Sequence, residues 1–202
     1  MSAEKEYNYW HRGFYGGIEY DLRDYLDILD FSNDTTLGKE PPETDLVIVK
    51  KVADRNIEND IGSFFDRYNI LEYKSPDDSL TIKELYKTYG YTFFYMDQTK
   101  DADVGNTTVT LVRDRFPKKL FYSLKAMGIS LEERCPGIYQ ISGELGLRTQ
   151  IVVTSKMLKG HSILRILRSK ADEEEVYLYV EEIEKYQNDQ RMNANLHVIF
   201  MS

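Results

Sequence analysis

The chain has 202 residues, of which 42% are hydrophobic, 13% aromatic and 30% charged. This composition supports a substantial hydrophobic core and excludes an intrinsically disordered chain. Its 34 acidic and 26 basic residues give a net charge of -8, which argues against a protein that coats nucleic acid through bulk positive charge. No apolar run approaches the roughly 18 to 20 residues of a membrane span, and the first residues contain no apolar signal segment. We therefore expect a soluble, cytoplasmic protein that has no membrane partner.

Cysteine and histidine are too sparse to support most metal or thiol chemistry. The single Cys135 excludes an internal disulfide framework and a cysteine-rich zinc site. No two of the three histidines share a metal-ligand spacing, and no dinucleotide-binding glycine motif, P-loop or nucleophile elbow is present. Any chemistry is expected to depend on carboxylates, lysines and a hard cation.

The first half of the chain alternates between helical and strand patterns. Apolar residues recur at helical spacing over residues 10–29, although Gly16 and Gly17 weaken the first turns and favour the second half as the helix. Residues 45–50 and 68–74 are rich in consecutive apolar and β-branched side chains, which is typical of buried strands.

The middle of the chain contains the clearest helix signal. Thr81 and Glu84 form the pattern of a capping box, and the apolar spacing behind them predicts a helix that ends near Met96. Residues 107–113 form a β-branched strand pattern. Pro117 and Gly128 then suit the beginning and end of a further helix.

The last third predicts a hairpin over residues 129–134 and 137–142, a strand at 149–154, and a helix opened by the acidic residues 172–175. The order of elements favours an α/β fold, with a central mixed sheet flanked by helices. We divide it into a core, residues 1–128, and a C-terminal α+β extension, residues 129–202, packed on that core.

Three charged residues at strand ends form the candidate site. Asp45 begins one predicted strand, and Glu72 and Lys74 end another. Residues two apart on a strand share a face, so Glu72 and Lys74 project together while Tyr73 points the other way. If the two strands are neighbours, Asp45 can approach Glu72. These carboxylates and the Tyr73 carbonyl would form an all-oxygen site suited to Mg²⁺ or Mn²⁺, and an adjacent lysine can orient a water molecule.

The segment Pro42-Glu43-Thr44-Asp45, followed by Glu72-Tyr73-Lys74, resembles the PD-(D/E)xK nuclease superfamily. The segments 14–23 and 72–79 are similar to a bacterial branch of it that contains transposase-related and recombination-promoting nucleases. The resemblance covers roughly residues 10–115 and implies a restriction-endonuclease-like fold. It also implies an additional metal-binding acid on the helix before the sheet. Glu19 matches that position, with Asp21 and Asp24 as weaker candidates.

Two functions remain open from the sequence. In the first, the protein hydrolyses DNA phosphodiester bonds: Glu19, Asp45 and Glu72 hold Mg²⁺ or Mn²⁺, and Lys74 positions the attacking water. In the second, it is a catalytically inactive nuclease-fold module that binds a protein partner or self-associates as a homodimer. The intact Asp45, Glu72 and Lys74 favour the enzyme. The net charge of -8 favours the binding module, in which Glu72 and Lys74 form only a structural ion pair.

The densest basic cluster follows the strand at 107–113. We predict that it contacts nucleic-acid phosphate, although a solvated strand end and helix start would have the same composition. Its members are Arg113, Arg115, Lys118 and Lys119.

Overall fold

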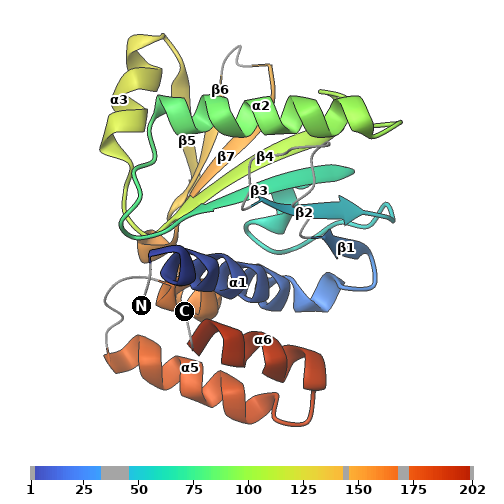
Figure 1. Ribbon diagram of the computed structural model, residues 1–202, viewed down its shortest axis with the longest axis vertical. Helices are drawn as coiled ribbons and strands as arrows, with labels where there is room; N and C mark the ends of the chain where they lie inside the picture. The colour runs from blue at the N-terminus through green and yellow to red at the C-terminus, as the bar shows by residue number, and fades with distance from the viewer. Residues whose placement is uncertain (1–2, 33–45, 143–145, 168–172, 201–202) are drawn as a thin grey trace.

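The computed structural model describes residues 3–32, 46–142, 146–167 and 173–200. They form an α/β fold in which a seven-stranded mixed sheet is flanked by helices on both faces (Figure 1). The strands are β1 (Leu29–Ser32), β2 (Leu46–Lys51), β3 (Tyr68–Lys74), β4 (Thr107–Arg113), β5 (Ser130–Cys135), β6 (Ile138–Ser142) and β7 (Arg148–Val153). The helices are α1 (Ala3–Asp21), α2 (Ile82–Gln98), α3 (Lys118–Ala126), α4 (Ser162–Ile166), α5 (Glu173–Lys185) and α6 (Gln190–Phe200).

The strand order in the sheet is β1-β2-β3-β4-β7-β6-β5. Strand β2 is antiparallel to both β1 and β3. Helix α2 connects β3 to β4, which is parallel to it, and β7 is parallel to β4. Strand β6 is antiparallel to both β7 and β5. The register pairs Leu46 of β2 with Glu72 of β3, and Lys74 of β3 with Arg113 of β4. The start of β2 and the ends of β3 and β4 therefore meet at one edge of the sheet.

Two hydrophobic layers hold the helices against the sheet. Helices α2 and α3 cover one face, where Leu85, Tyr89 and Leu120 pack on Val109 and Leu111. Helix α1, with α4, α5 and α6 beyond it, covers the other face (Figure 1). Because β3 and β4 are covered on both faces, nearly every residue in them is buried.

Helix α2 begins where the capping pattern predicts. The Thr81 side chain accepts a hydrogen bond from the Lys83 amide, and the Glu84 carboxylate accepts one from the Thr81 amide at 3.0 Å. These contacts satisfy amide donors that have no partner within the first turn of a helix.

Helix α1 differs from its prediction. It spans Ala3–Asp21, whereas residues 23–25 form a 3₁₀ turn and Leu29 begins β1. The glycines that weaken helix propensity here lie at close contacts with the C-terminal helices: a Cβ on Gly16 would stand 3.1 Å from the Asn195 carbonyl oxygen of α6. Tertiary packing therefore outweighs local propensity in the first half of the segment.

The predicted extension contributes three strands to the same sheet. Strand β7 pairs with β4 of the core, and the β5–β6 hairpin continues the sheet beyond it. Across the described ranges, no helix is both long and apolar enough to cross a membrane.

Candidate functional site

Glu72 and Lys74 form an ion pair at the carboxyl end of β3. Both side chains face α2, where the hydroxyl of Thr88 donates a hydrogen bond to the other carboxylate oxygen of Glu72. Glu72 is only 4% exposed and the Lys74 side chain 12%, so the pair is buried rather than solvated. Removing one member would leave an uncompensated charge in a region of low polarity.

Tyr73 points to the opposite face, as the alternation of β3 predicts. Its ring stacks on Phe14 of α1 with 5.1 Å between the centroids, and its hydroxyl donates to the Leu167 carbonyl at 2.8 Å. Burial raises the pKa of this hydroxyl, so it stays protonated. The Tyr73 side chain anchors the sheet to α1, and a role for its main-chain carbonyl as a metal ligand stays a prediction.

Arg113 lies beside Lys74 across the β3–β4 ladder. It is 8% exposed, and the neighbouring Asp114 is 3% exposed. Burial lowers the pKa of Arg113 and raises the pKa of Asp114. Within the described part of the chain, Arg113 Nε and Asp114 Oδ1 are buried and form no hydrogen bond. Buried polar atoms without a partner are rare in native structures, so these two atoms distinguish the edge beside Lys74.

The rest of the predicted basic cluster is exposed. Arg115 lies 3.5 Å from the Asp114 carboxylate through its Nε, and Lys118 and Lys119 form the solvent-facing first turn of α3. The structure therefore divides the cluster into one buried arginine at the sheet edge and three basic groups beyond it.

His11 of α1 also lies near this edge, although no spacing in the sequence indicates it. Its ring meets the Tyr73 ring edge-on, with 6.4 Å between centroids. Burial and the charge of Lys74 lower its pKa to about 4, against a smaller opposing effect of Asp78. His11 is therefore neutral at neutral pH. The helix crossing that brings it to β3 is a tertiary feature, which sequence spacing does not encode.

Replacing Lys74 with methionine should raise the pKa of His11, because it removes the positive charge that disfavours the imidazolium. We expect a rise, with burial, the larger cause, still holding the pKa below 6.5. Histidine NMR titration measures this directly. Lys87→Met, on the exposed side of α2, is the matched control and should change nothing. An unaltered His11 titration in Lys74→Met would contradict the proximity of the two groups.

The structure does not bring Glu19 to this edge. Glu19 is buried on α1, where Arg191 Nε of α6 donates to it at 3.2 Å and Asn195 donates to its second oxygen. Helix α1 covers the sheet face opposite to the one that Glu72 points toward (Figure 1). Glu19 therefore joins the two ends of the chain. Asp45, the other predicted acid, lies outside the described residues.

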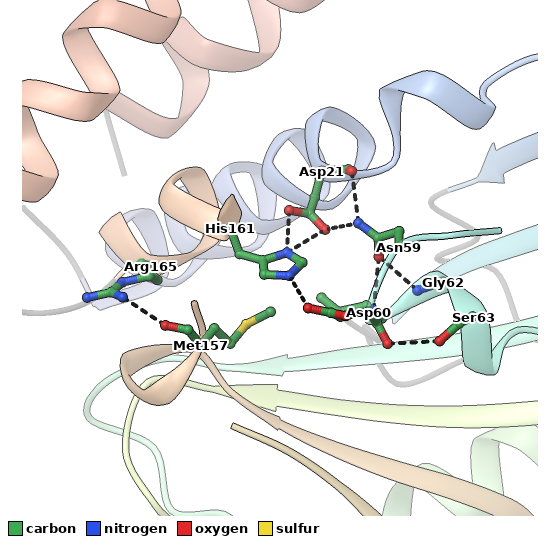
Figure 2. Close-up of polar contacts among 9 residues, drawn as sticks. Asp21, Asn59, Asp60, Gly62, Ser63, Met157, His161 and Arg165 are labelled. Atoms are coloured by element: carbon green, nitrogen blue, oxygen red, sulfur yellow. Dashed lines mark hydrogen bonds and ion pairs between the residues drawn. The ribbon is translucent and has the colours of Figure 1, made fainter. Parts of the chain in front are cut away.

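Asp21, the weaker candidate from the same helix, belongs to a separate polar cluster (Figure 2). It accepts a hydrogen bond from Asn59 at 2.8 Å and lies 2.8 Å from His161 Nδ1. Asp60 contacts the other ring nitrogen, Nε2, at 3.0 Å. Burial would lower the pKa of His161, but the hydrogen bonds and charges of the two carboxylates outweigh it and raise the pKa to about 9.

This cluster, Asp21–Asn59–Asp60–His161, is a bridge and not a set of metal ligands. Each ring nitrogen of the charged imidazolium is directed at its own carboxylate, so the oxygens lie on opposite sides of the ring (Figure 2). His161 thereby ties the end of α1 to the segment between β2 and β3. The residues that contact each other are 38 to 140 positions apart, which explains why no sequence motif indicated the cluster.

Glu72 and Thr88 provide oxygen atoms, which suit a hard cation such as Mg²⁺ better than a soft one. Among residues 3–32, 46–142, 146–167 and 173–200, no group of three or more histidine, cysteine, aspartate or glutamate side chains is arranged to hold a metal. Comparisons with protein-family models, with curated proteins and with solved structures found no match to this chain.

Proposed function

We propose that this protein is a divalent-metal-dependent nuclease that hydrolyses DNA phosphodiester bonds at the carboxyl end of β3. The observation that carries the proposal is the buried Glu72–Lys74 pair, held by Thr88 and flanked by Arg113. A buried acid and ammonium at a strand end are costly to maintain.

The topology supports the same location. Leu46, which follows Asp45 in the sequence, pairs with Glu72 across β2 and β3. In the restriction-endonuclease-like arrangement that we propose, Asp45 and Glu72 supply the carboxylate ligands and the Tyr73 carbonyl a third oxygen. Glu19 has no part in this version of the site, because Arg191 and Asn195 bind its carboxylate.

A bound Mg²⁺ or Mn²⁺ would lower the pKa of a coordinated water and polarise a phosphoryl oxygen. In the proposal, Lys74 orients that water and balances negative charge, and Glu72 holds the ammonium in place. Arg113, which lies beside Lys74 across the β3–β4 ladder, adds a second positive charge to the site. Arg115, Lys118 and Lys119 contact the phosphates further along the strand.

Plasmid nicking with Mg²⁺ or Mn²⁺ tests the proposal. Lys74→Met and Glu72→Gln should each slow nicking by on the order of a hundredfold or more, because each removes one charge from the reaction centre. Asp45→Asn should do the same. Lys100→Met, which alters an exposed lysine in the turn after α2, is the control and should nick like the wild type. Thermal unfolding must show that each variant is folded.

Calorimetric titration with Mn²⁺ separates this function from the second one, an inactive nuclease-fold module that binds a protein. The observation that favours the module is that both Glu72 oxygens already have partners, Lys74 and Thr88. A nuclease should bind Mn²⁺ in the wild type and bind it more weakly in Glu72→Gln. Equal nicking by all variants would assign the activity to a contaminant, and a wild type without nicking or Mn²⁺ binding would support the module.

A further inference from the structure

The outer face of α2 is unusually apolar for an exposed helix surface. Tyr86, Phe93 and Phe94 are 49%, 46% and 56% exposed, although the helix already buries another face against the sheet. Figure 1 shows α2 as the outermost layer on its side of the sheet. A surface helix usually presents polar residues to water, and clustered exposed aromatic side chains mark an interaction surface. We define the α2 outer face as seven of the eight exposed residues of the helix: Lys83, Tyr86, Lys87, Gly90, Phe93, Phe94 and Asp97; the eighth, Gln98, is the last residue of the helix and lies to one side of this face.

These seven positions are symmetric about Gly90. They lie three, four and seven residues before it and three, four and seven residues after it. When two identical helices pack antiparallel about a two-fold axis, residues equally distant from the axis on either side become opposite each other. An axis at Gly90 therefore places Lys83 opposite Asp97, and Tyr86 opposite Phe94, of a second copy.

The chemistry of these pairs is complementary. Lys83 and Asp97 have opposite charges, Tyr86 and Phe94 are both aromatic, and Lys87 comes opposite Phe93, where an ammonium can lie over a ring. Because of the two-fold symmetry, each contact occurs twice. The α2 outer faces of two copies are therefore complementary in charge and in apolar character when the two helices run antiparallel.

The geometry of the face also suits close helix packing. No atom lies within 4 Å of the position that a Cβ on Gly90 would occupy, so a second helix can approach at the axis. Met127 of α3 borders the face through a 3.7 Å contact with the Tyr86 hydroxyl and, at 47% exposure, extends its apolar area.

We propose that this chain forms a two-fold homodimer in which α2 packs antiparallel against α2 of a second copy, with the axis at Gly90. Thr88, which binds Glu72, is on the buried side of α2. The dimer therefore leaves the end of β3 uncovered, and the proposal does not depend on the nuclease assignment.

A charge-reversal experiment tests both the interface and its register. In Lys83→Asp, both symmetry-related pairs become acid against acid, and in Asp97→Lys both become base against base. Each variant alone should dimerise on the order of a hundredfold more weakly than the wild type in sedimentation equilibrium. Mixed in equal amounts, they should form a heterodimer, because one chain then has acids at both positions and the other has bases. Lys100→Asp and Asp103→Lys, which reverse exposed charges off this face, are the controls and should dimerise normally.

Disulfide trapping locates the axis independently. Gly90→Cys, in a background in which Cys135 is replaced by serine, should give a covalent dimer under mild oxidation, whereas Ser63→Cys, at an exposed position elsewhere, should not. A wild type that remains monomeric at the highest attainable concentration would overturn the proposal. So would reversed-charge variants that dimerise like the wild type, or a mixture that associates no better than its components.

Discussion

Replacing Gly137 with alanine is expected to lower the free energy of unfolding by about 3 kcal/mol or more. Gly137 is in the turn between β5 and β6, at φ +83°. A Cβ there would stand 2.7 Å from the Val153 carbonyl oxygen and 2.9 Å from the Met157 amide nitrogen. Both of these are backbone atoms, so the clash with the new Cβ could be removed only if the turn moved away from the end of β7. Urea unfolding followed by circular dichroism measures the loss.

Gly128 provides the matched control for this substitution. It has a similar conformation, φ +74°, but no atom lies within 4 Å of the position of its Cβ. Gly128→Ala should therefore cost only the strain of the left-handed backbone, about 1 kcal/mol. The difference between the two losses of unfolding free energy measures the cost of the steric clash at Gly137. Equal losses would mean that the hairpin can move away from β7 freely.

The second large effect is a loss of stability at alkaline pH. The pKa of His161 is raised from 6.5 to about 9 in the folded chain, so the folded state binds a proton more tightly than the unfolded state. The resulting stabilisation is fully present below pH 6.5 and is lost as the pH rises through 9. A displacement of this size corresponds to about 3 kcal/mol of unfolding free energy.

Unfolding curves measured from pH 6 to pH 10 would show this decline in the wild type and a flatter profile in His161→Gln. His197→Gln, at an exposed position on α6, should keep the wild-type slope. His11 does not interfere, because its lowered pKa destabilises the fold only below the alkaline window. A slope unchanged by His161→Gln would show that the carboxylates of Asp21 and Asp60 do not stabilise the imidazolium.

The elements that the sequence predicts best are those whose local and tertiary signals agree. Strands β3 and β4 have the predicted bounds, and α2 begins at its capping box, because each has a pattern set by its own residues. The hairpin of β5 and β6 is confirmed for the same reason: Pro136 and Gly137 form its turn. At the candidate site, the alternation along β3 was sufficient to predict that Glu72 and Lys74 share a face and that Tyr73 does not.

The features that were missed depend on contacts between distant segments. Leu29 was predicted to end a helix, but it begins β1 because its backbone pairs with Lys51 of β2. Glu19 has the polarity of a metal ligand, and only the position of α6 shows that its partners are Arg191 and Asn195. His11 and Asp114 approach the candidate site only after α1 and β4 have packed beside β3. The spacing of residues along the chain does not indicate which distant residues become neighbours in the fold.

The pairing of α1 with α6 has a consequence for how the chain acquires its structure during synthesis. Helix α1 buries Glu19 and packs Gly16 against residues of α6, although Glu19 and its partner Arg191 are 172 positions apart. In a nascent chain that lacks residues 190–200, the apolar side of α1 that packs against α6 is therefore exposed to solvent. We infer that α1 completes its packing only once residues 190–200 have been synthesised, and that chains which stop before them are the ones most exposed to aggregation and proteolysis.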